Sequence, residues 1–366
     1  MERPIYTIEP PTWAETAKIP MANYTARLGD RTIGLGHPCL LSFEAGATHS
    51  GLESCKRLCT AVAKAGGEAV KFQTTRTEEL MTDREVRIEY TTATGKSSES
   101  IYDALKRREL SNDEWASLKK HCDDLGLLFI STPTGPNTVD LLANLKAAAI
   151  KISKSDINHT VLIEQAANTG IPIILDAREK FQDVERALQI CERANNSNVI
   201  VMHCPSGYPA ESAGLHLSAI SVIREIFRVP VAYSDHSVGT AISYAVMGLG
   251  VDMLEKTITE DKYADQVEQW MSLEPHELEE FVKTAREIEQ AKGDPRIIFN
   301  SRVNAVYRRS IVASRDISVG EVLDLDNLTF MRPGTFLSVD QIDAVKGRTA
   351  ARAIAQGEYL SLDDVE

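Results

Sequence analysis

Two short polar runs follow apolar, β-branched segments in the second half of the chain. The first is 233–236 (YSDH) and the second is 254–257 (LEKT). An imidazole or a carboxylate can transfer a proton or bind a divalent ion, and a lysine can hold an anion. Charged groups inside apolar segments cost free energy unless they are paired or used. The two runs therefore indicate a chemical site to which distant parts of the chain contribute.

Short β-branched runs alternate with amphipathic helical patterns between residues 39 and 290. The predicted strands are 39–44, 69–74, 127–132, 148–152, 171–175, 198–203, 229–234 and 252–256. Helical patterns between them include 52–65 and 112–125, the latter with Ser111 as N-cap and Gly126 as the stop signal. Successive βα units of this number predict an α/β fold, a (β/α)8 TIM barrel.

Such a barrel places its chemistry at the C-terminal ends of the strands. Polar residues stand at most of the predicted ends: Glu44, Lys71, Gln73, Thr132, Lys151, His203, Ser234 to His236, Glu255 and Lys256. For His203 a hydrogen-bonded core histidine is the favoured alternative. For the lysines the alternative is a stem packed on the barrel rim with its amine in water.

The length of 366 residues fits one large domain and one small one. Residues 1–38 are an N-terminal extension and a hairpin (24–33), which we expect to close the bottom of the barrel. The barrel takes 39–295 and a linker takes 296–309. A small module takes 310–366, and its size suggests that it docks on the barrel or on a second subunit.

Composition narrows the class of partner. The net charge of −13, without a Lys/Arg-rich run, argues against nucleic acid and anionic membrane and favours small molecules. Residues 1–18 lack a signal-peptide pattern, and no run of about 18 apolar residues occurs, so we expect a soluble cytoplasmic protein. The six cysteines form no CxxC, and 55 and 59 share one face of a predicted helix. Reduced thiols are favoured over a zinc or disulfide framework.

Several motifs, in order along the chain, resemble those of the sialic acid synthase family. They are 43–46 (FEAG), 49–51 (HSG), 69–74 (AVKFQT), 131–133 (STP), 151–152 (KI), 203–204 (HC), 208–209 (YP), 233–236 and 255–256. The C-terminal runs 320–323 (GEVL) and 332–335 (RPGT) look like the antifreeze-like SAF domain of that family, a β-clip fold.

Members of that family condense phosphoenolpyruvate with an N-acetylated sugar aldehyde and release phosphate, giving a nine-carbon 2-keto acid. The resemblance implies these contacts to phosphoenolpyruvate and acceptor: Lys71, Thr132, Lys151, Ser206, Tyr208 and Ser234. It implies that Glu44, Gln73 and Glu255 take part in catalysis and that His236 binds a divalent metal, manganese or magnesium. It also implies a homodimer in which Arg332 of one subunit's SAF domain reaches the sugar pocket of the other. Two lysines with hydroxyl donors suit a compact trianion.

Departures from the family pattern fall at the same strand ends. Thr257 replaces the second metal histidine, and a neutral hydroxyl is a poor ligand for a first-row divalent ion, which makes metal binding doubtful. The runs 152–155 (ISKS), 176–179 (DARE) and 267–269 (VEQ) replace family motifs and add Lys154, Arg178 and Glu268 as candidate substrate-binding residues.

These departures leave two interpretations. In one, the site is re-purposed for a different or more anionic acceptor, and a lysine polarises the aldehyde in place of a metal. In the other, the site has decayed and the protein is a silent partner of an active synthase. The retained Glu44, Lys71, Lys151 and His236 favour the first. We therefore predict a phosphoenolpyruvate-dependent, carbon–carbon bond-forming synthase with an altered metal site, and a related transferase or lyase with another substrate as the alternative.

Overall fold

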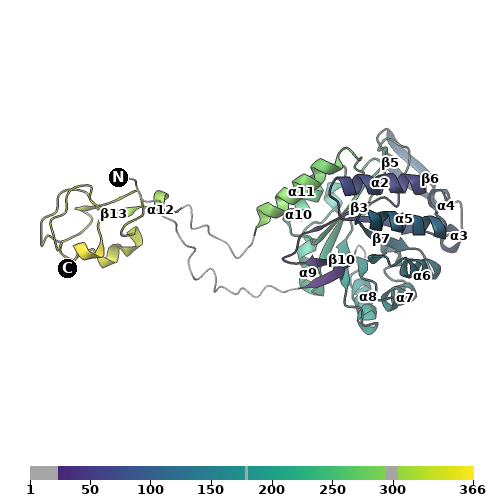
Figure 1. Ribbon diagram of the computed structural model, residues 1–366, viewed down its shortest axis with the longest axis horizontal. Helices are drawn as coiled ribbons and strands as arrows, with labels where there is room; N and C mark the ends of the chain where they lie inside the picture. The colour runs from purple at the N-terminus through teal and green to yellow at the C-terminus, as the bar shows by residue number, and fades with distance from the viewer. Residues whose placement is uncertain (1–23, 178–179, 294–303) are drawn as a thin grey trace. The chain divides into compact units, whose positions relative to one another are not determined.

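The computed structural model describes residues 24–177, 180–293 and 304–366. Its contacts divide the described chain into two compact units, one over residues 24–293 and one over residues 304–366 (Figure 1). The predicted N-terminal extension falls largely outside the described residues, as do Arg178 and most of the predicted linker.

Eight parallel strands close into a barrel in the first unit. They are β3 (Leu40–Glu44), β4 (Ala69–Thr74), β7 (Leu128–Pro133), β8 (Ala149–Ile152), β9 (Ile173–Asp176), β10 (Val199–His203), β11 (Val231–Asp235) and β12 (Met253–Thr257). Each strand pairs with the next along the chain, and β12 closes the ring on β3. The predicted TIM barrel is confirmed, with strand ends that differ by one or two residues.

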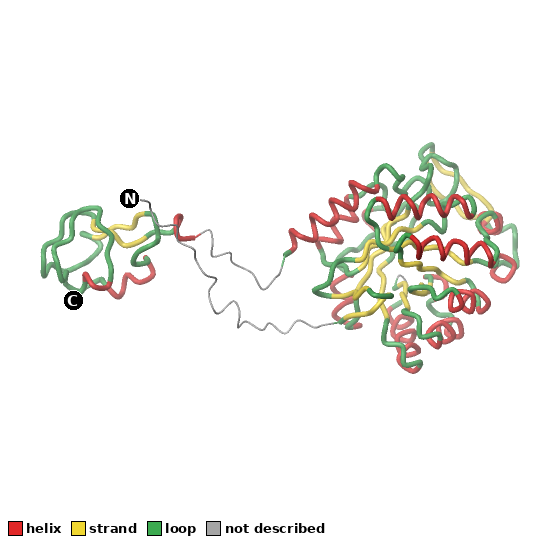
Figure 2. Tube along the Cα trace, in the orientation of Figure 1, coloured by secondary structure: helices red, strands yellow, loops and turns green. Residues whose placement is uncertain are grey.

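Helices cover the outside of the strands (Figure 2). They are α2 (Leu52–Lys64), α5 (Asn112–Asp124), α6 (Pro136–Asn144), α7 (Thr160–Asn168), α8 (Phe181–Arg193), α9 (Ala219–Phe227), α10 (Ala241–Gly248) and α11 (Leu278–Lys292). Ser111 caps α5 as predicted, since its hydroxyl accepts from the Glu114 N–H and the Glu114 carboxylate accepts in return. Gly126 then ends the segment with φ 72°.

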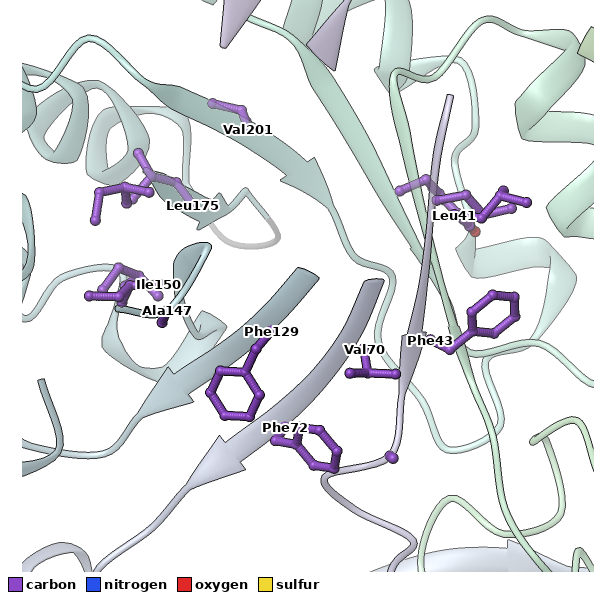
Figure 3. Close-up of a cluster of buried hydrophobic side chains, with 14 of the residues drawn as sticks. Leu41, Phe43, Val70, Phe72, Phe129, Ala147, Ile150, Leu175 and Val201 are labelled. Atoms are coloured by element: carbon purple, nitrogen blue, oxygen red, sulfur yellow. The ribbon is translucent and has the colours of Figure 1, made fainter. Parts of the chain in front are cut away.

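The main core lies between the strands and the helices. Figure 3 shows Phe43, Val70, Phe72 and Phe129 projecting from neighbouring strands into this layer. The ring centroids of Phe72 and Phe129 are 5.6 Å apart. Because strand side chains alternate between faces, the residues between these apolar positions must point into the barrel. The six cysteines are buried free thiols.

The hairpin of β1 (Thr25–Leu28) and β2 (Arg31–Gly34) closes the N-terminal end of the barrel, as predicted. Its side chains Ala26, Leu28 and Ile33 form one buried cluster with inward residues at the strand starts, among them Leu40 and Ala69. Closing this end leaves the C-terminal mouth as the open end of the barrel.

An insertion between β4 and α5 was not predicted. It comprises α3 (Thr77–Leu80), β5 (Arg87–Thr92), β6 (Gly95–Ser100) and α4 (Ile101–Lys106), and β5 pairs with β6. The Thr91 N–H donates to the Tyr208 carbonyl at 3.2 Å, and the Val267 N–H donates to Glu99 Oε1 at 3.4 Å. The insertion therefore contacts the loops that follow β10 and β12 at the barrel mouth.

The second unit has its own small core. Its elements are α12 (Asn304–Tyr307), β13 (Ser310–Ala313), β14 (Leu328–Met331) and two 3-10 helices, η4 (Val339–Ala344) and η5 (Leu362–Asp364). Ile311, Leu323, Ile354 and Leu360 are among its buried residues. The end of the predicted linker is helical here, since α12 lies within it. Among the described residues of both units, no helix is long and apolar enough to cross a membrane.

Candidate active site

A cavity of about 500 Å³ opens at the C-terminal mouth of the barrel. Ten of the sequence-predicted site residues line it: Glu44, Lys71, Gln73, Thr132, Lys151, Lys154, Tyr208, His236, Glu255 and Glu268. The strand pairing explains this grouping, because Glu44 lies opposite Lys71 and Ser234 lies opposite Glu255 at inward positions. The alternation of the strands thus gathers residues that are far apart in sequence.

Four predicted residues are not among the described lining residues of the cavity. Ser234 lies beside the cavity floor, where its hydroxyl donates to Glu255 Oε1 at 2.7 Å. Ser206 is exposed, with its hydroxyl 3.5 Å from the Lys154 amine. Arg178 is outside the described residues. Arg332 belongs to the second unit, where its guanidinium lies 5.7 Å from the Tyr307 ring centroid.

Two buried ion pairs form the floor of the cavity. Lys71 Nζ is 2.7 Å from Glu44 Oε2, and Lys151 Nζ is 2.7 Å from Glu255 Oε1. Both lysines are 5% exposed, so the alternative in which their amines lie in water is wrong. Gln73 Nε2 donates to Glu44 Oε1 at 3.4 Å and so helps to orient that carboxylate.

The floor carboxylates differ in their electrostatics. Burial opposes ionisation of Glu255, but the attraction of Lys151 and Lys71 outweighs it and lowers the pKa to about 2. For Glu44, burial and repulsion from Glu255 outweigh the attraction of Lys71, and the pKa is raised. Burial opposes the charge of Lys151, yet Glu255 raises its pKa overall. The floor therefore holds one firmly ionised carboxylate and one that accepts a proton more readily.

Two buried polar atoms on this floor, Glu255 Oε2 and Thr132 Oγ1, have no hydrogen-bond partner among the described residues. A buried polar atom left in this state costs free energy that a bound polar molecule or water would recover. Thr132 is thus placed to donate to an anion held between the two lysines.

His236 is held on the wall by its neighbours. Its Nε2 lies 3.2 Å from the Ser234 hydroxyl and 4.0 Å from the Cys204 thiol, and its ring centroid is 5.0 Å from that of Tyr208. Cys204 also lines the cavity, and it was not predicted because a lone cysteine carries no spacing signal.

The residues at the mouth do not fit a two-histidine metal site. Thr257 occupies the inward end of β12, opposite Glu44, where its hydroxyl offers a weaker ligand than an imidazole. His236 is the one imidazole among the described residues that line the cavity. Within the described ranges, the group of ligand atoms close enough for a metal is Glu274, His276 and Glu277, away from the cavity, and Lys262 already neutralises its carboxylates.

Two polar residues at the predicted strand ends face away from the site. His203 Nε2 lies 2.7 Å from the Leu215 carbonyl, and its ring packs on Tyr233, which supports the core-histidine alternative. Lys256 is fully buried against Asp235 at 3.2 Å and donates to the Ser237 carbonyl. The expectation that Lys256 contributes to the site is wrong, because its side chain points toward the helices.

Arg108 is a cavity residue that the sequence did not reveal. It follows α4 and is 7% exposed. Its Nη1 donates to the carbonyl of Ala47, which also lines the cavity. No carboxylate of a described residue lies within 4.0 Å of its guanidinium. The insertion also supplies an apolar wall that includes Leu80, Ile88 and Leu105. The only signal was an arginine within a charged run, which is typical of a solvated surface.

Comparisons with known proteins agree with this geometry. A protein-family model described as the NeuB family matches residues 58–296, and a SAF domain model matches residues 308–366. The chain is 32% identical over 344 residues to an uncharacterized protein of Methanocaldococcus jannaschii, covering 93% of this chain and 98% of the relative. It is 30% identical over 305 residues to the human N-acetylneuraminate-9-phosphate synthase, covering 82% and 84%.

Two further matches are named as a synthase and a synthetase of acidic sugars. The N,N'-diacetyllegionaminic acid synthase of Legionella pneumophila is 27% identical over 347 residues, covering 92% of this chain and 98% of the relative. The crystal structure of the N-acetylneuraminic acid synthetase of Leptospira borgpetersenii, in complex with citrate, superposes with a TM-score of 0.68 at 27% identity, covering 76% of this chain and 94% of the other. With the family model spanning most of the barrel and these identities extending along the chain, the protein belongs to the NeuB family and carries a SAF domain at its C-terminal end.

Proposed function

We propose that this protein is a synthase that condenses phosphoenolpyruvate with an aldehyde sugar, or amino sugar, to give a nonulosonic 2-keto acid. The observation that carries the proposal is the pair of buried lysines, Lys71 and Lys151, beside the unpartnered Thr132 hydroxyl in a chain of this family. A phosphate and a carboxylate held on one carbon atom of a small molecule require such convergent cations and hydroxyls.

The reaction needs positions for two substrates. The electron pair of the C2–C3 double bond of phosphoenolpyruvate forms the new bond to the aldehyde carbon, and the aldehyde oxygen takes up a proton. Water adds to C2, and the bond between C2 and the phosphate oxygen then breaks, so that phosphate leaves with the electron pair. One proton of this water goes to the phosphate that leaves. The other returns to the group that protonated the aldehyde oxygen.

The floor residues supply the positioning in this scheme. Lys71 and Lys151 bind the anionic groups, with Thr132 and Ser206 as hydroxyl donors, while Ser234 acts through the hydrogen bond that it donates to Glu255. Glu44, whose raised pKa makes it the better base, takes a proton from the water that adds to C2 and passes it to the departing phosphate, and Gln73 orients it.

The acceptor occupies the half of the cavity beneath the insertion. Arg108 and Tyr208 offer polar contacts there, and the apolar wall suits a methyl substituent such as that of an acyl group. Lys154 extends the positive charge at the rim, and Arg178, which is outside the described residues, stays a candidate from the sequence alone. Since Thr257 removes one imidazole, protein groups rather than a metal polarise the aldehyde in this proposal.

Binding and turnover test the proposal together. Calorimetry should show that the full-length protein binds phosphoenolpyruvate without added metal. A screen of N-acetylated aldehyde sugars should then yield phosphate release and a 2-keto acid product, detected by mass spectrometry. A protein that does not bind phosphoenolpyruvate would instead support the decayed site and a role as a silent partner.

A further inference from the structure

Two cavity residues of opposite charge, Arg108 and Glu268, have no oppositely charged partner within 4.0 Å in the part of the chain that the structure describes. The Arg108 guanidinium has one hydrogen bond there, to the Ala47 carbonyl. The Glu268 carboxylate has no ion pair within 4.0 Å and no hydrogen bond to a described residue. Buried charges are costly unless a partner compensates them. Arg108 is buried and Glu268 is half-buried, so a ligand group that pairs with either charge would stabilise it.

The loop after β12 holds Glu268 at the cavity wall. Its backbone has φ 70°, a left-handed conformation that is rare for a residue with a long side chain. The Ser272 hydroxyl donates to the Glu268 carbonyl at 2.6 Å, and the buried Gln269 side chain donates to the Thr48 carbonyl at 3.2 Å. Backbone strain of this kind persists where the surroundings fix it and is often found at functional sites.

The charges that line the cavity favour protonation of one carboxylate when an anionic substrate binds. The described lining contains four cations, Lys71, Arg108, Lys151 and Lys154, and five carboxylates, Glu44, Asp156, Asp176, Glu255 and Glu268. When all are ionised, the carboxylates outnumber the cations by one, and the lining carries a net negative charge. Phosphoenolpyruvate adds further negative charge to a cavity whose floor lysines are already paired. Protonation of a carboxylate would relieve that repulsion.

We propose that Glu268 is the proton donor to the carbonyl oxygen of the acceptor aldehyde, and that it takes up this proton when phosphoenolpyruvate binds. The inference rests on the proposed synthase function. Glu268 is the better donor because Glu255 is held ionised by Lys151 and Ser234, and Glu44 is paired with Lys71. Arg108, on the same wall, then stabilises the carboxylate that remains.

The step balances within the reaction. As the carbon–carbon bond forms, the π pair of the carbonyl moves to its oxygen, the O–H bond of the Glu268 carboxyl breaks, and the carbonyl becomes a hydroxyl. One proton of the water that adds to C2 restores the carboxyl, and the other leaves with phosphate. The Glu268 carboxyl thus stabilises the negative charge that develops on the aldehyde oxygen, as a metal ion would do as a Lewis acid.

The surrounding charges support this assignment. Those whose fields reach the Glu268 carboxyl are Glu44 of β3, Lys71 of β4, Arg108 after α4 and Glu255 of β12. Burial and the repulsion of Glu44 raise the pKa of Glu268 to about 7, against the attraction of Lys71 and Arg108. A bound trianion raises this pKa further. The acid form is therefore present below the pKa of the complex and is lost as pH rises through it.

Calorimetry in buffers of different ionisation enthalpy measures the proton directly. At pH 8, Glu268 is mostly ionised in the free protein, so binding of phosphoenolpyruvate should take up about one proton. In Glu268→Gln, uptake should fall by more than half while affinity stays equal or increases, because a negative charge is removed. The matched control is Glu99→Gln, which keeps an acceptor for the Val267 N–H but does not line the cavity; its uptake should equal that of the natural protein.

Kinetics give a second readout. In Glu268→Gln, kcat should fall about 10²- to 10⁴-fold and the alkaline limb of its pH profile should disappear. Glu268→Asp keeps a carboxylic acid, so it should retain part of kcat and the alkaline limb of the pH profile. Circular dichroism checks that each variant is folded. Unchanged uptake, or an unchanged kcat and limb, in a folded Glu268→Gln would overturn the inference. Failure of the natural protein to bind phosphoenolpyruvate would instead overturn the proposed function.

Discussion

The lysines at the cavity floor are paired with carboxylates, so a substitution of one partner also affects the other. Lys151→Ala removes a charge-assisted contact worth about 1.5–3 kcal/mol, so phosphoenolpyruvate should bind about ten- to a hundredfold more weakly. It also leaves Glu255 buried without its cation, which adds repulsion toward the anion. Calorimetry on Lys151→Ala and on the double variant Lys151→Met/Glu255→Gln separates the lost contact from the repulsion by unpaired Glu255. The surface variant Lys120→Ala is the control. Unchanged affinity in Lys151→Ala would contradict the assigned role.

Thr257 is the residue that sets the metal requirement. If it has dismantled a two-histidine site, the purified protein should carry little tightly held manganese, magnesium or zinc, and chelator should leave its activity intact. Thr257→His should increase manganese affinity, because it lies at the inward end of β12 and His236 follows the adjacent strand β11. Elemental analysis and metal titration measure this. Stoichiometric metal in the natural protein would refute the metal-independent scheme.

At the scale of elements, the insertion between β4 and α5 provides the acceptor half of the cavity. Arg108→Ala should therefore raise KM for the acceptor at least about tenfold, by loss of a charge-assisted hydrogen bond, while the affinity for phosphoenolpyruvate changes little. Arg107→Ala is the matched control, because Arg107 pairs with Glu99 at 2.9 Å and does not line the cavity. Equal effects of both variants on acceptor KM would indicate a disturbance of the insertion as a whole.

The same insertion shows the limit of reading elements from sequence. The barrel strands are apolar runs of buried residues, and α5 carries its cap, so both were predictable. The strand β6 contains no apolar residue, and β5 alternates only through Ile88, Tyr90 and Thr92, so the pair gives a weak strand signal in the sequence. Their position was decided by contacts such as that between Thr91 and Tyr208.

At the scale of the whole molecule, we propose a homodimer in which the SAF domains are exchanged and Arg332 completes the partner's site. The loop around Arg332 is firmly shaped within its own domain. The Tyr359 hydroxyl donates to the Arg332 carbonyl at 2.7 Å, and Gly334 lies so close to Arg308 that a Cβ would meet it at 2.5 Å. Light scattering should show a dimer.

Mixing two inactive variants tests the exchange. If Arg332 acts in the partner's site, Lys151→Ala and Arg332→Ala, unfolded and refolded together, should regain about a quarter of the natural sites, because half of the dimers are mixed and each mixed dimer has one intact site. If Arg332 acted within its own subunit, no site would be restored. The mixture of Lys151→Ala with Lys71→Ala is the control, since neither arrangement restores a site there.

The sequence by itself determined the barrel, the order of its strands, and the candidate residues at the strand ends, because burial imposes patterns of apolar residues that can be read locally. Tertiary structure decided which way each polar side chain faces: a shift of one position separates Glu255 in the cavity from Lys256 among the helices. It also decided which lysine meets which carboxylate and brought Arg108 and Glu268 to one wall. Those arrangements depend on strand register and on contacts between distant loops, which no local pattern records.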